Sequence, residues 1–144
     1  MLFRSTDELA AWLEQMDPAT VGLALDTAEV TIAGHDAVAF YRRFQPRVWH
    51  VHLKDALAVD TLNEYRAANA ERALLQAGGE RRVPRWFGEL GTGLVDFPAL
   101  MQALREARYA GWLIVESDKG PAPQAAAMMQ NAWTVRQVLK PLLA

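Results

Sequence analysis

The chain has 144 residues and a mass of 16.0 kDa, a size that fits one domain. Its 51% hydrophobic and 22% charged residues exclude collagens, disordered tails and membrane proteins. The 15 basic and 17 acidic residues give a net charge of −2, which argues against a nucleic-acid-binding surface. Because there is no cysteine, disulfides and thiolate metal ligands are excluded. Residues 1–12 lack the apolar core of a signal peptide, and no run reaches the roughly 18 apolar residues of a membrane span, so we expect a cytoplasmic protein without membrane contact.

The first part of the chain alternates helical patterns with short apolar runs. A helix is expected over 5–16, which opens with a capping-box pattern. The run 21–26 predicts a strand buried on both faces, and 48–53 predicts a second strand. Between them, 36–44 has the apolar stripe of a helix.

The second part of the chain continues this alternation. A longer helix is expected over 60–77, followed by a basic loop with glycines over 80–93. Asp96 and Pro98 mark the start of another helix, and 112–116 predicts the third strand. A final helix is expected to face the core with residues at helical spacing: Met128, Ala132, Val135, Leu139 and Leu142. The adjacent Met129 is assigned to the same core-facing helix.

Strands that are separated by helices cannot pair as hairpins, so the sheet is expected to be parallel. The predicted fold class is therefore α/β. An all-parallel sheet needs cover on both faces, and three strands make a poor closed sheet. We therefore expect this chain to be part of a larger architecture.

Each predicted strand ends in a side chain that can bind a metal ion: Asp26, His52 and Glu116. The carboxyl ends of parallel strands meet at one edge of a sheet, where the active sites of α/β folds gather. Two carboxylates and an imidazole suit Mn²⁺, Mg²⁺, Co²⁺ or Zn²⁺. Taken singly, Asp26 is explained equally well as a helix or turn cap, and Glu116 as a solvated strand end. Their shared edge favours the metal site.

The histidines and the residues after the second strand allow further assignments. His50 precedes His52 by two positions and therefore points to the same side of the sheet. We interpret His50 as a hydrogen-bonded core histidine and His35 as a surface residue. Lys54 and Asp55 follow the strand into the rim of the predicted site, where they either contact a polyol or phosphate or pair with each other.

The loop before the last helix–strand unit has two features that resemble anion sites. Gly91 and Gly93 flank a threonine, but the Walker lysine is missing, so we interpret the segment as a backbone turn that requires positive φ. Arg81, Arg82 and Arg85 are interpreted as a solvated cluster that could also help to hold an anionic substrate. The chain has no Gly-x-Ser-x-Gly motif, which argues against the usual serine hydrolases.

Four segments carry a resemblance to a known family: Leu25–Glu29, His50–Asp55, Leu90–Phe97 and Trp112–Asp118. In this order they resemble the C-terminal half of the sugar phosphate isomerase/epimerase family. This is the xylose isomerase-like TIM barrel group, which includes inosose dehydratase and tagatose or psicose 3-epimerases. The resemblance implies that residues 1–144 form one partial TIM barrel, with three parallel strands that correspond to the last three βα units.

The resemblance also implies roles for individual residues. Asp26, His52 and Glu116 match the family's metal ligands, and Glu116 matches an acid/base group that moves a proton next to a carbonyl. The divalent metal ion would polarise that carbonyl. We expect Glu29, Lys54 and Asp55 to contact the sugar or polyol substrate.

Two departures from the family pattern bear on activity. Glu29 stands where the family has a substrate-contacting histidine, and a carboxylate cannot donate the same hydrogen bond. The family's fourth metal ligand and second acid/base group belong to a strand that would precede Met1. One hypothesis is a metal-dependent isomerase, epimerase or related dehydratase that another chain completes. The alternative is a non-catalytic half-barrel that self-associates and keeps a relic metal site.

The expected partner follows from the strands at the two edges of the sheet. Residues 21–26 and 112–116 would lack strand neighbours on their outer sides, which leaves unpaired backbone groups. We also expect Leu23, Leu25, Val51 and Ile114 to lose the opposite wall of a barrel core. A homodimer or a complementing barrel half would cover these surfaces.

Overall fold

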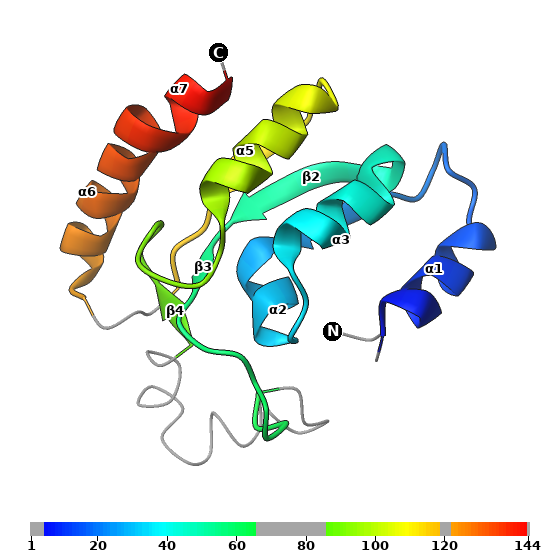
Figure 1. Cartoon of the computed structure of the whole chain (residues 1–144), viewed down its shortest axis with the longest axis horizontal. Coiled ribbons are helices and arrows are strands. Elements are labelled where there is room, and N and C mark those ends of the chain that lie inside the picture. The colour runs from blue at the N-terminus through cyan, green and yellow to red at the C-terminus, as the bar shows by residue number, and fades with distance from the viewer. Residues whose placement is uncertain (1–4, 66–85, 119–121, 144) are drawn as a thin grey trace.

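A three-stranded parallel sheet forms the centre of the computed structural model, which describes residues 5–65, 86–118 and 122–143 (Figure 1). The strands follow one another across the sheet in the order β1 (Leu23–Asp26), β2 (Val48–Leu53) and β5 (Trp112–Val115). The register places Asp26 beside His52, and His52 beside Ile114. The predicted α/β fold with a parallel sheet is confirmed.

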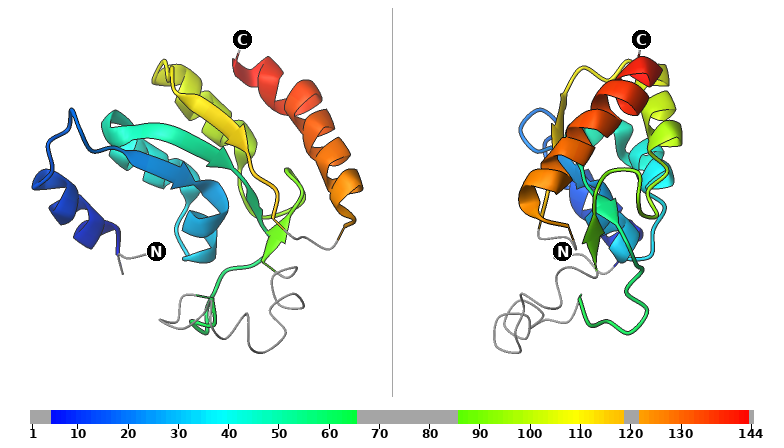
Figure 2. Two further views of the ribbon diagram at one scale, coloured as in Figure 1. Left: turned by 180° about the vertical axis from the view of Figure 1, so that it is seen from behind. Right: turned by 90° about the vertical axis from the view of Figure 1, so that its left-hand side faces the viewer.

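Helices cover one face of this sheet. In Figure 2, α3 and α5 lie across the same face, and the view from behind shows β1, β2 and β5 in front of them. The helical segments are α1 (Thr6–Glu14), α2 (Thr27–Ile32), α3 (Ala37–Phe44), the 3₁₀ turn η1 (Gln45–Arg47), α5 (Phe97–Glu106), α6 (Gln124–Thr134), η4 (Val135–Leu139) and α7 (Lys140–Leu143). The last three are continuous, and α7 packs against α5. We call the helix-packed side of the sheet the covered face and the other side the open face.

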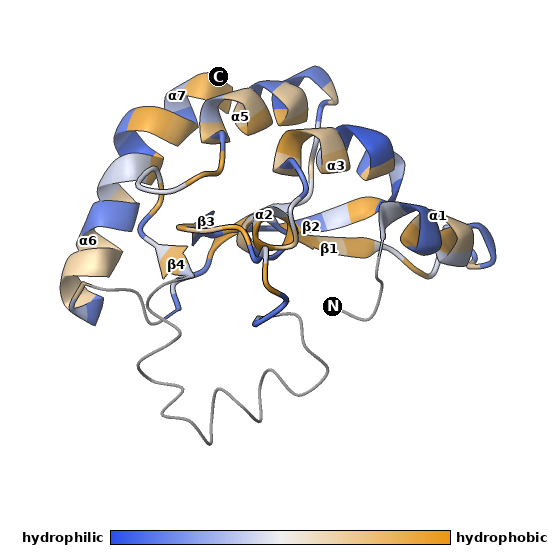
Figure 3. Cartoon of the chain, turned by 60° about the horizontal axis from the view of Figure 1, so that its bottom comes forward, coloured by the Kyte–Doolittle hydropathy of each residue, from blue (hydrophilic) through white to orange (hydrophobic). Residues whose placement is uncertain are grey.

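The hydrophobic core lies between the covered face and the helices. Leu25 of β1 and Val51 of β2 point into it and are 1% and 0% exposed. The helices and the adjoining turns contribute further fully buried side chains: Tyr41, Phe97, Leu100, Met101 and Leu104. The expectation that Leu25 and Val51 face a barrel lumen is therefore wrong, because alternation along the strand turns them towards the helices. Figure 3 shows β1 as a mostly apolar strand, as this burial requires.

Three short elements were not expected from the sequence: one helix and two strands. Helix α2 follows β1 without a break, since Asp26 ends the strand and also caps the helix. Beyond β2, the strand β3 (Asp55–Ala56) pairs in antiparallel fashion with β4 (Phe87–Gly88). The strands β3 and β4 form a separate two-stranded sheet that follows the carboxyl end of β2.

The helix expected over 60–77 is not found where it can be compared. Residues 60–65 form turns, with Asn63 at a φ of 58°, which a regular helix does not allow. Residues 66–77 lie outside the described part of the chain, as do residues 80–85 of the basic loop expected over 80–93.

The final helix faces the core with a different stripe from the one expected. Ala127, Asn131 and Thr134 are buried, whereas Met128 and Met129 are exposed. The predicted set of core-facing residues is thus wrong by one position at the start of the helix. At 135–139 the chain makes a π-helical turn, and the wider turn brings Leu139 into the core as expected.

The helices in the described ranges are all too short or too polar to cross a lipid bilayer.

Candidate metal centre

The three strand-end residues meet at the carboxyl edge of the sheet, as their positions predict. Asp26, His52 and Glu116 each offer one ligand atom, and these atoms lie within 4.8 Å of one another. Ligand bonds of about 2.0–2.6 Å place the donor atoms of one ion roughly 3–5 Å apart. The three side chains are half-buried, and Nδ1 of His52 hydrogen-bonds to Oε2 of Glu116. This donor set fits a divalent cation.

Asp26 serves the helix and the site with different oxygen atoms. Its Oδ1 accepts a hydrogen bond of 2.9 Å from the backbone N–H of Glu29 and so caps α2. Its Oδ2 lies 3.1 Å from Nζ of Lys54. The capping role and the metal-ligand role are therefore compatible, because each uses its own oxygen.

Lys54 places a positive charge among the carboxylates of this cluster. Its Nζ lies 3.1 Å from Asp26, 2.7 Å from Glu116 and 2.8 Å from Asp118. The side chain is 5% exposed, and the ammonium lies 4.8 Å from the centre of the Phe87 ring. Burial alone would lower the pKa of Lys54, but the three carboxylates outweigh burial and raise it above its usual range. Lys54 does not pair with Asp55 but with the candidate metal ligands.

The same ammonium controls the ionisation of Glu116. Burial on its own would raise the pKa of Glu116, but the hydrogen bonds and charges of Lys54 and His52 hold it below its ordinary value. Glu116 also continues the sheet ladder, since its backbone N–H donates to the carbonyl of Leu53 at 3.1 Å. An ionised carboxylate is thereby fixed at the strand end.

Thr27 holds the end of β2 against the start of α2. Its hydroxyl accepts a hydrogen bond of 3.0 Å from the N–H of Lys54 and donates one of 2.5 Å to the carbonyl of the same residue. Because Thr27 directly follows Asp26, this contact fixes the spacing between the two strands that carry Asp26 and His52.

Glu29 lies beside the cluster and is held by Tyr65, a residue that the sequence analysis did not single out. The Tyr65 hydroxyl donates a hydrogen bond of 2.5 Å to Oε1 of Glu29. Burial raises the pKa of Glu29, the hydrogen bond from Tyr65 opposes this, and the charge of Asp26 adds to it. The Tyr65 ring packs against Trp86 and Phe87, with ring centres 5.5 and 6.0 Å away.

Asp55 holds a loop, and its position argues against the expected contact with a substrate. The residue is fully buried, and its carboxylate accepts four backbone hydrogen bonds of 2.9–3.1 Å, from Ala56, Gly91, Gly93 and Val95. Every lone-pair direction that a substrate would use is thus engaged by the loop.

The glycines of this loop are explained by backbone geometry. Gly91 has a φ of 85°, as expected for a turn, whereas a Cβ at Gly93 would lie 2.3 Å from the carbonyl oxygen of Ala56. Two side chains of α6 hold the other side of the loop: Asn131 accepts from the N–H of Leu90, and Thr134 donates to its carbonyl. The loop is thereby fixed between β3 and α6.

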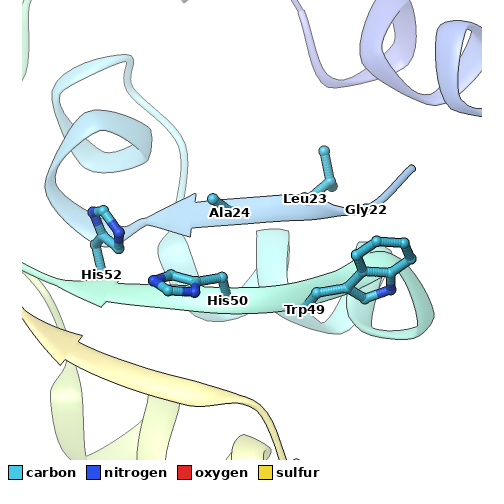
Figure 4. Close-up of a pocket in the computed structure, with 6 residues that line it drawn as sticks. All are labelled: Gly22, Leu23, Ala24, Trp49, His50 and His52. Atoms are coloured by element: carbon cyan, nitrogen blue, oxygen red, sulfur yellow. The ribbon is translucent and has the colours of Figure 1, made fainter. Parts of the chain in front are cut away.

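The open face carries a shallow depression beside the cluster. It has a volume of about 430 Å³ and is lined by Gly22, Leu23, Ala24, Trp49, His50 and His52 (Figure 4). His50 and His52 project from the same side of β2, with ring centres 4.9 Å apart. His50 is half-buried on this face, whereas the sequence analysis expected it in the core. His35 is half-buried, and Arg81, Arg82 and Arg85 lie outside the described residues.

Comparison with known proteins identifies the fold family. The model of the xylose isomerase-like TIM barrel family matches residues 1–134. The chain is 33% identical to the inosose dehydratase of Geobacillus thermodenitrificans over 95% of its own length and 43% of that protein. It is 29% identical to the inosose dehydratase of Lacticaseibacillus casei, over 83% and 38% of the two chains.

Solved structures share the fold at lower identity. A probable 3-DHS dehydratase from Bacillus anthracis superposes with a TM-score of 0.65 at 18% identity, over 92% of this chain and 44% of that one. A sugar phosphate isomerase/epimerase from Parabacteroides distasonis gives 0.61 at 17% identity, over 97% and 38%. The chain thus spans about two-fifths of the length of its relatives. It belongs to the xylose isomerase-like TIM barrel family.

Proposed function

We propose that Asp26, His52 and Glu116 bind a divalent metal ion and form part of an active site for a sugar or polyol. The observation that carries this proposal is the meeting of an imidazole and two carboxylates at the edge of the sheet, with ligand atoms within 4.8 Å of one another. The proposed reaction is the transfer of a proton at a carbon next to a carbonyl. We assign the chain to the C-terminal half of such a barrel.

The relatives support this class of substrate and reaction. Their names describe the dehydration of an inosose and the isomerisation or epimerisation of a sugar phosphate. Loss of water from a keto-polyol and inversion at a carbon next to a carbonyl both begin with removal of a proton from that carbon. One carboxylate that works as a general base therefore serves either reaction.

Glu116 is the residue that we assign as this base. The charge of Lys54 holds its pKa below the ordinary value, so that the carboxylate is ionised and ready to accept a proton. The contact of 2.7 Å to Nζ of Lys54 fixes one oxygen of Glu116. A bound metal ion would supply the polarisation of the substrate carbonyl. Asp55 contributes indirectly, because it holds the Gly91–Val95 loop against β3.

Titration calorimetry with Mn²⁺ tests the metal site. We expect one ion per chain for the wild type and at least about ten-fold weaker binding for Asp26→Asn and His52→Ala, since each loses one ligand. Asp26→Asn keeps an oxygen that can cap α2, so the helix is preserved. Glu106→Gln, on the exposed end of α5, is the matched control and should bind Mn²⁺ like the wild type. Absence of binding by the wild type, or equal binding by all variants, contradicts the proposal.

A second candidate function rests on the open face. Trp112 and Ile114 of β5 are 75% and 39% exposed there, and the described residues provide no strand beside the outer edges of β1 and β5. Exposed apolar strands of this kind favour association. We propose that a second copy of the chain covers this face in a homodimer, so that the chain is a non-catalytic interaction module with a relic metal site.

Light scattering over a dilution series tests the homodimer. We expect a dimer that dissociates on dilution, and an Ile114→Lys variant that dissociates at higher concentration because the new charge lies in the interface. A monomer at every concentration contradicts self-association. It would leave a complementing barrel half as the cover of this face.

A further inference from the structure

We propose that Lys54 takes the place of a cation at the candidate metal centre until a metal ion binds, and that Asp118 then holds the displaced ammonium group. The proposal deepens the proposed function and rests on it, because it requires a metal ion at Asp26, His52 and Glu116. Asp118 is a positioning residue, since it acts on the metal centre only through Lys54.

The ammonium group of Lys54 contacts two of the candidate metal ligands. Its Nζ lies 3.1 Å from Oδ2 of Asp26 and 2.7 Å from Oε1 of Glu116. The other oxygen of Asp26 is already used, because Oδ1 accepts from the N–H of Glu29 and caps α2. The other oxygen of Glu116, Oε2, contacts Nδ1 of His52. Oδ2 and Oε1 are therefore the ligand oxygens whose present partner an entering cation would replace.

Lys54 cannot keep both contacts beside a metal ion. Oδ2 of Asp26 and Oε1 of Glu116 each lie within 3.1 Å of Nζ, so a cation bonded to them would face the ammonium group at short range. The Lys54 side chain is 5% exposed, and water screens the repulsion between buried charges only weakly. A divalent ion carries twice the charge of the ammonium group and is therefore attracted more strongly to the two carboxylates. We expect Lys54 to leave both carboxylates when the ion binds.

Asp118 offers the ammonium group a carboxylate outside the ligand set. Its Oδ2 lies 2.8 Å from Nζ of Lys54, whereas the ligand atoms that lie within 4.8 Å of one another belong to the three candidate metal ligands. The Asp118 side chain is 42% exposed, compared with 19% for Asp26 and 33% for Glu116. A buried charge that loses all of its partners is costly. By keeping its contact with Asp118, Lys54 can leave the two ligands and stay paired at the more exposed side of the cluster.

Titration calorimetry with Mn²⁺ on the full chain tests the competition between the ion and the ammonium group. Lys54→Met keeps a side chain of similar length and removes its charge, so Mn²⁺ should bind at least about five-fold more tightly than to the wild type. Without metal ions, this variant leaves Asp26 and Glu116 without their cation, so it should unfold at a lower urea concentration than the wild type. Saturating Mn²⁺ should reduce this difference, because the tighter binding stabilises the folded variant more.

A double-mutant cycle tests the role of Asp118. With Lys54 present, Asp118→Asn removes the carboxylate that holds the displaced ammonium group, so Mn²⁺ binding should weaken by about five-fold or more. In the Lys54→Met background, the same substitution should change the Mn²⁺ affinity by less than about two-fold. The titrations are made in about 1 M KCl, where the screening length is about 3 Å and the loss of a distant charge has little effect. The control Asp7→Asn removes an exposed carboxylate that pairs with Arg43, and it should bind Mn²⁺ like the wild type.

The outcomes distinguish this inference from the proposed function. If the wild type does not bind Mn²⁺, both proposals fall. If the wild type binds Mn²⁺ but Lys54→Met binds it equally or more weakly, Lys54 does not compete with the ion, and the metal site stands without this inference. If Asp118→Asn weakens Mn²⁺ binding equally with and without Lys54, Asp118 acts on the ion directly, and its role as holder of the ammonium group is wrong. Should Lys54→Met fail to fold, Asp118→Asn alone decides, and a wild-type affinity for Mn²⁺ in that variant overturns the inference.

Discussion

The two faces of the same three strands differ sharply in what they contact. On the covered face, Leu25 and Val51 are in full contact with the helices and lose nearly all of their exposure. On the open face, Trp112 stays largely exposed and Ile114 partly exposed, and His50 and His52 line a shallow depression. Because side chains alternate along a strand, one residue packs against the helices and the next one points to the open face. The covered face supplies the packing that holds the three strands in place.

The largest difference between the two faces should appear in stability. We expect Leu25→Ala to lower the free energy of unfolding by about 2–5 kcal/mol, since it leaves a cavity among packed side chains. Ile114→Ala on the open face should cost under about 1 kcal/mol, because the side chain is partly solvated already. Urea denaturation of both variants measures the contrast. Equal losses would show that the open face is as well covered as the other one.

A variant of Asp55 tests how far the loop at the carboxyl edge of the sheet depends on this carboxylate. Asp55→Asn keeps the size of the side chain, but its NH2 group replaces one carboxylate oxygen and cannot accept the hydrogen bonds of the two backbone N–H groups that it faces. We expect a loss of about 2–3 kcal/mol in the free energy of unfolding. The control Asp7→Asn changes an exposed side chain, so the free energy of unfolding should change by under about 0.5 kcal/mol. A loss no larger than that of the control would mean that the loop does not depend on this carboxylate.

The smallest effects concern pH, and two glutamates should act in opposite directions. The pKa of Glu116 is lowered in the folded state, so its ionisation stabilises the fold above the ordinary pKa of 4.5, and this contribution is lost as the pH falls through the folded pKa. The pKa of Glu29 is raised, so its ionisation costs stability at neutral pH, and this cost disappears below pH 4.5.

Urea denaturation without metal ions measures these contributions at pH 7 and in acid. Glu116→Gln should be less stable than the wild type at pH 7, and Glu29→Gln more stable. Each difference should be under about 1 kcal/mol, since both groups are partly solvated. Both differences should shrink in acid. If both variants shift the free energy of unfolding in the same direction at pH 7, the claim that the fold shifts the pKa values of the two glutamates in opposite directions is wrong.

The strands and the site at their ends could be predicted from the sequence because the signals are local. Three apolar runs that end in Asp26, His52 and Glu116 define both the sheet and the cluster. Helix α2 also had a local signal, since Asp26 and Glu29 have the spacing of a cap and its third helical residue. A helix cap is one of the two explanations of Asp26 that the sequence allows, and the structure confirms the cap, although the helix that it starts was not expected.

Other features depend on contacts between distant segments, which a single sequence does not reveal. The bond from Tyr65 to Glu29 joins residues 36 positions apart, and the amides that Asp55 accepts from include three from a loop 36–40 positions away. The buried face of α6 is a further example. Asn131 and Thr134 are buried because they hydrogen-bond to the backbone of Leu90. Hydrophobicity alone instead predicts that Met128 and Ala132 face the core.

The metal centre is tested most directly by crystals grown with Mn²⁺ and measured at the manganese absorption edge. We predict one anomalous peak among Asp26, His52 and Glu116 at bonding distance from all three, with Nζ of Lys54 moved away from the ion because the two positive charges repel. Crystals that diffract well in saturating Mn²⁺, show no peak there and keep Lys54 between the carboxylates would contradict the metal centre.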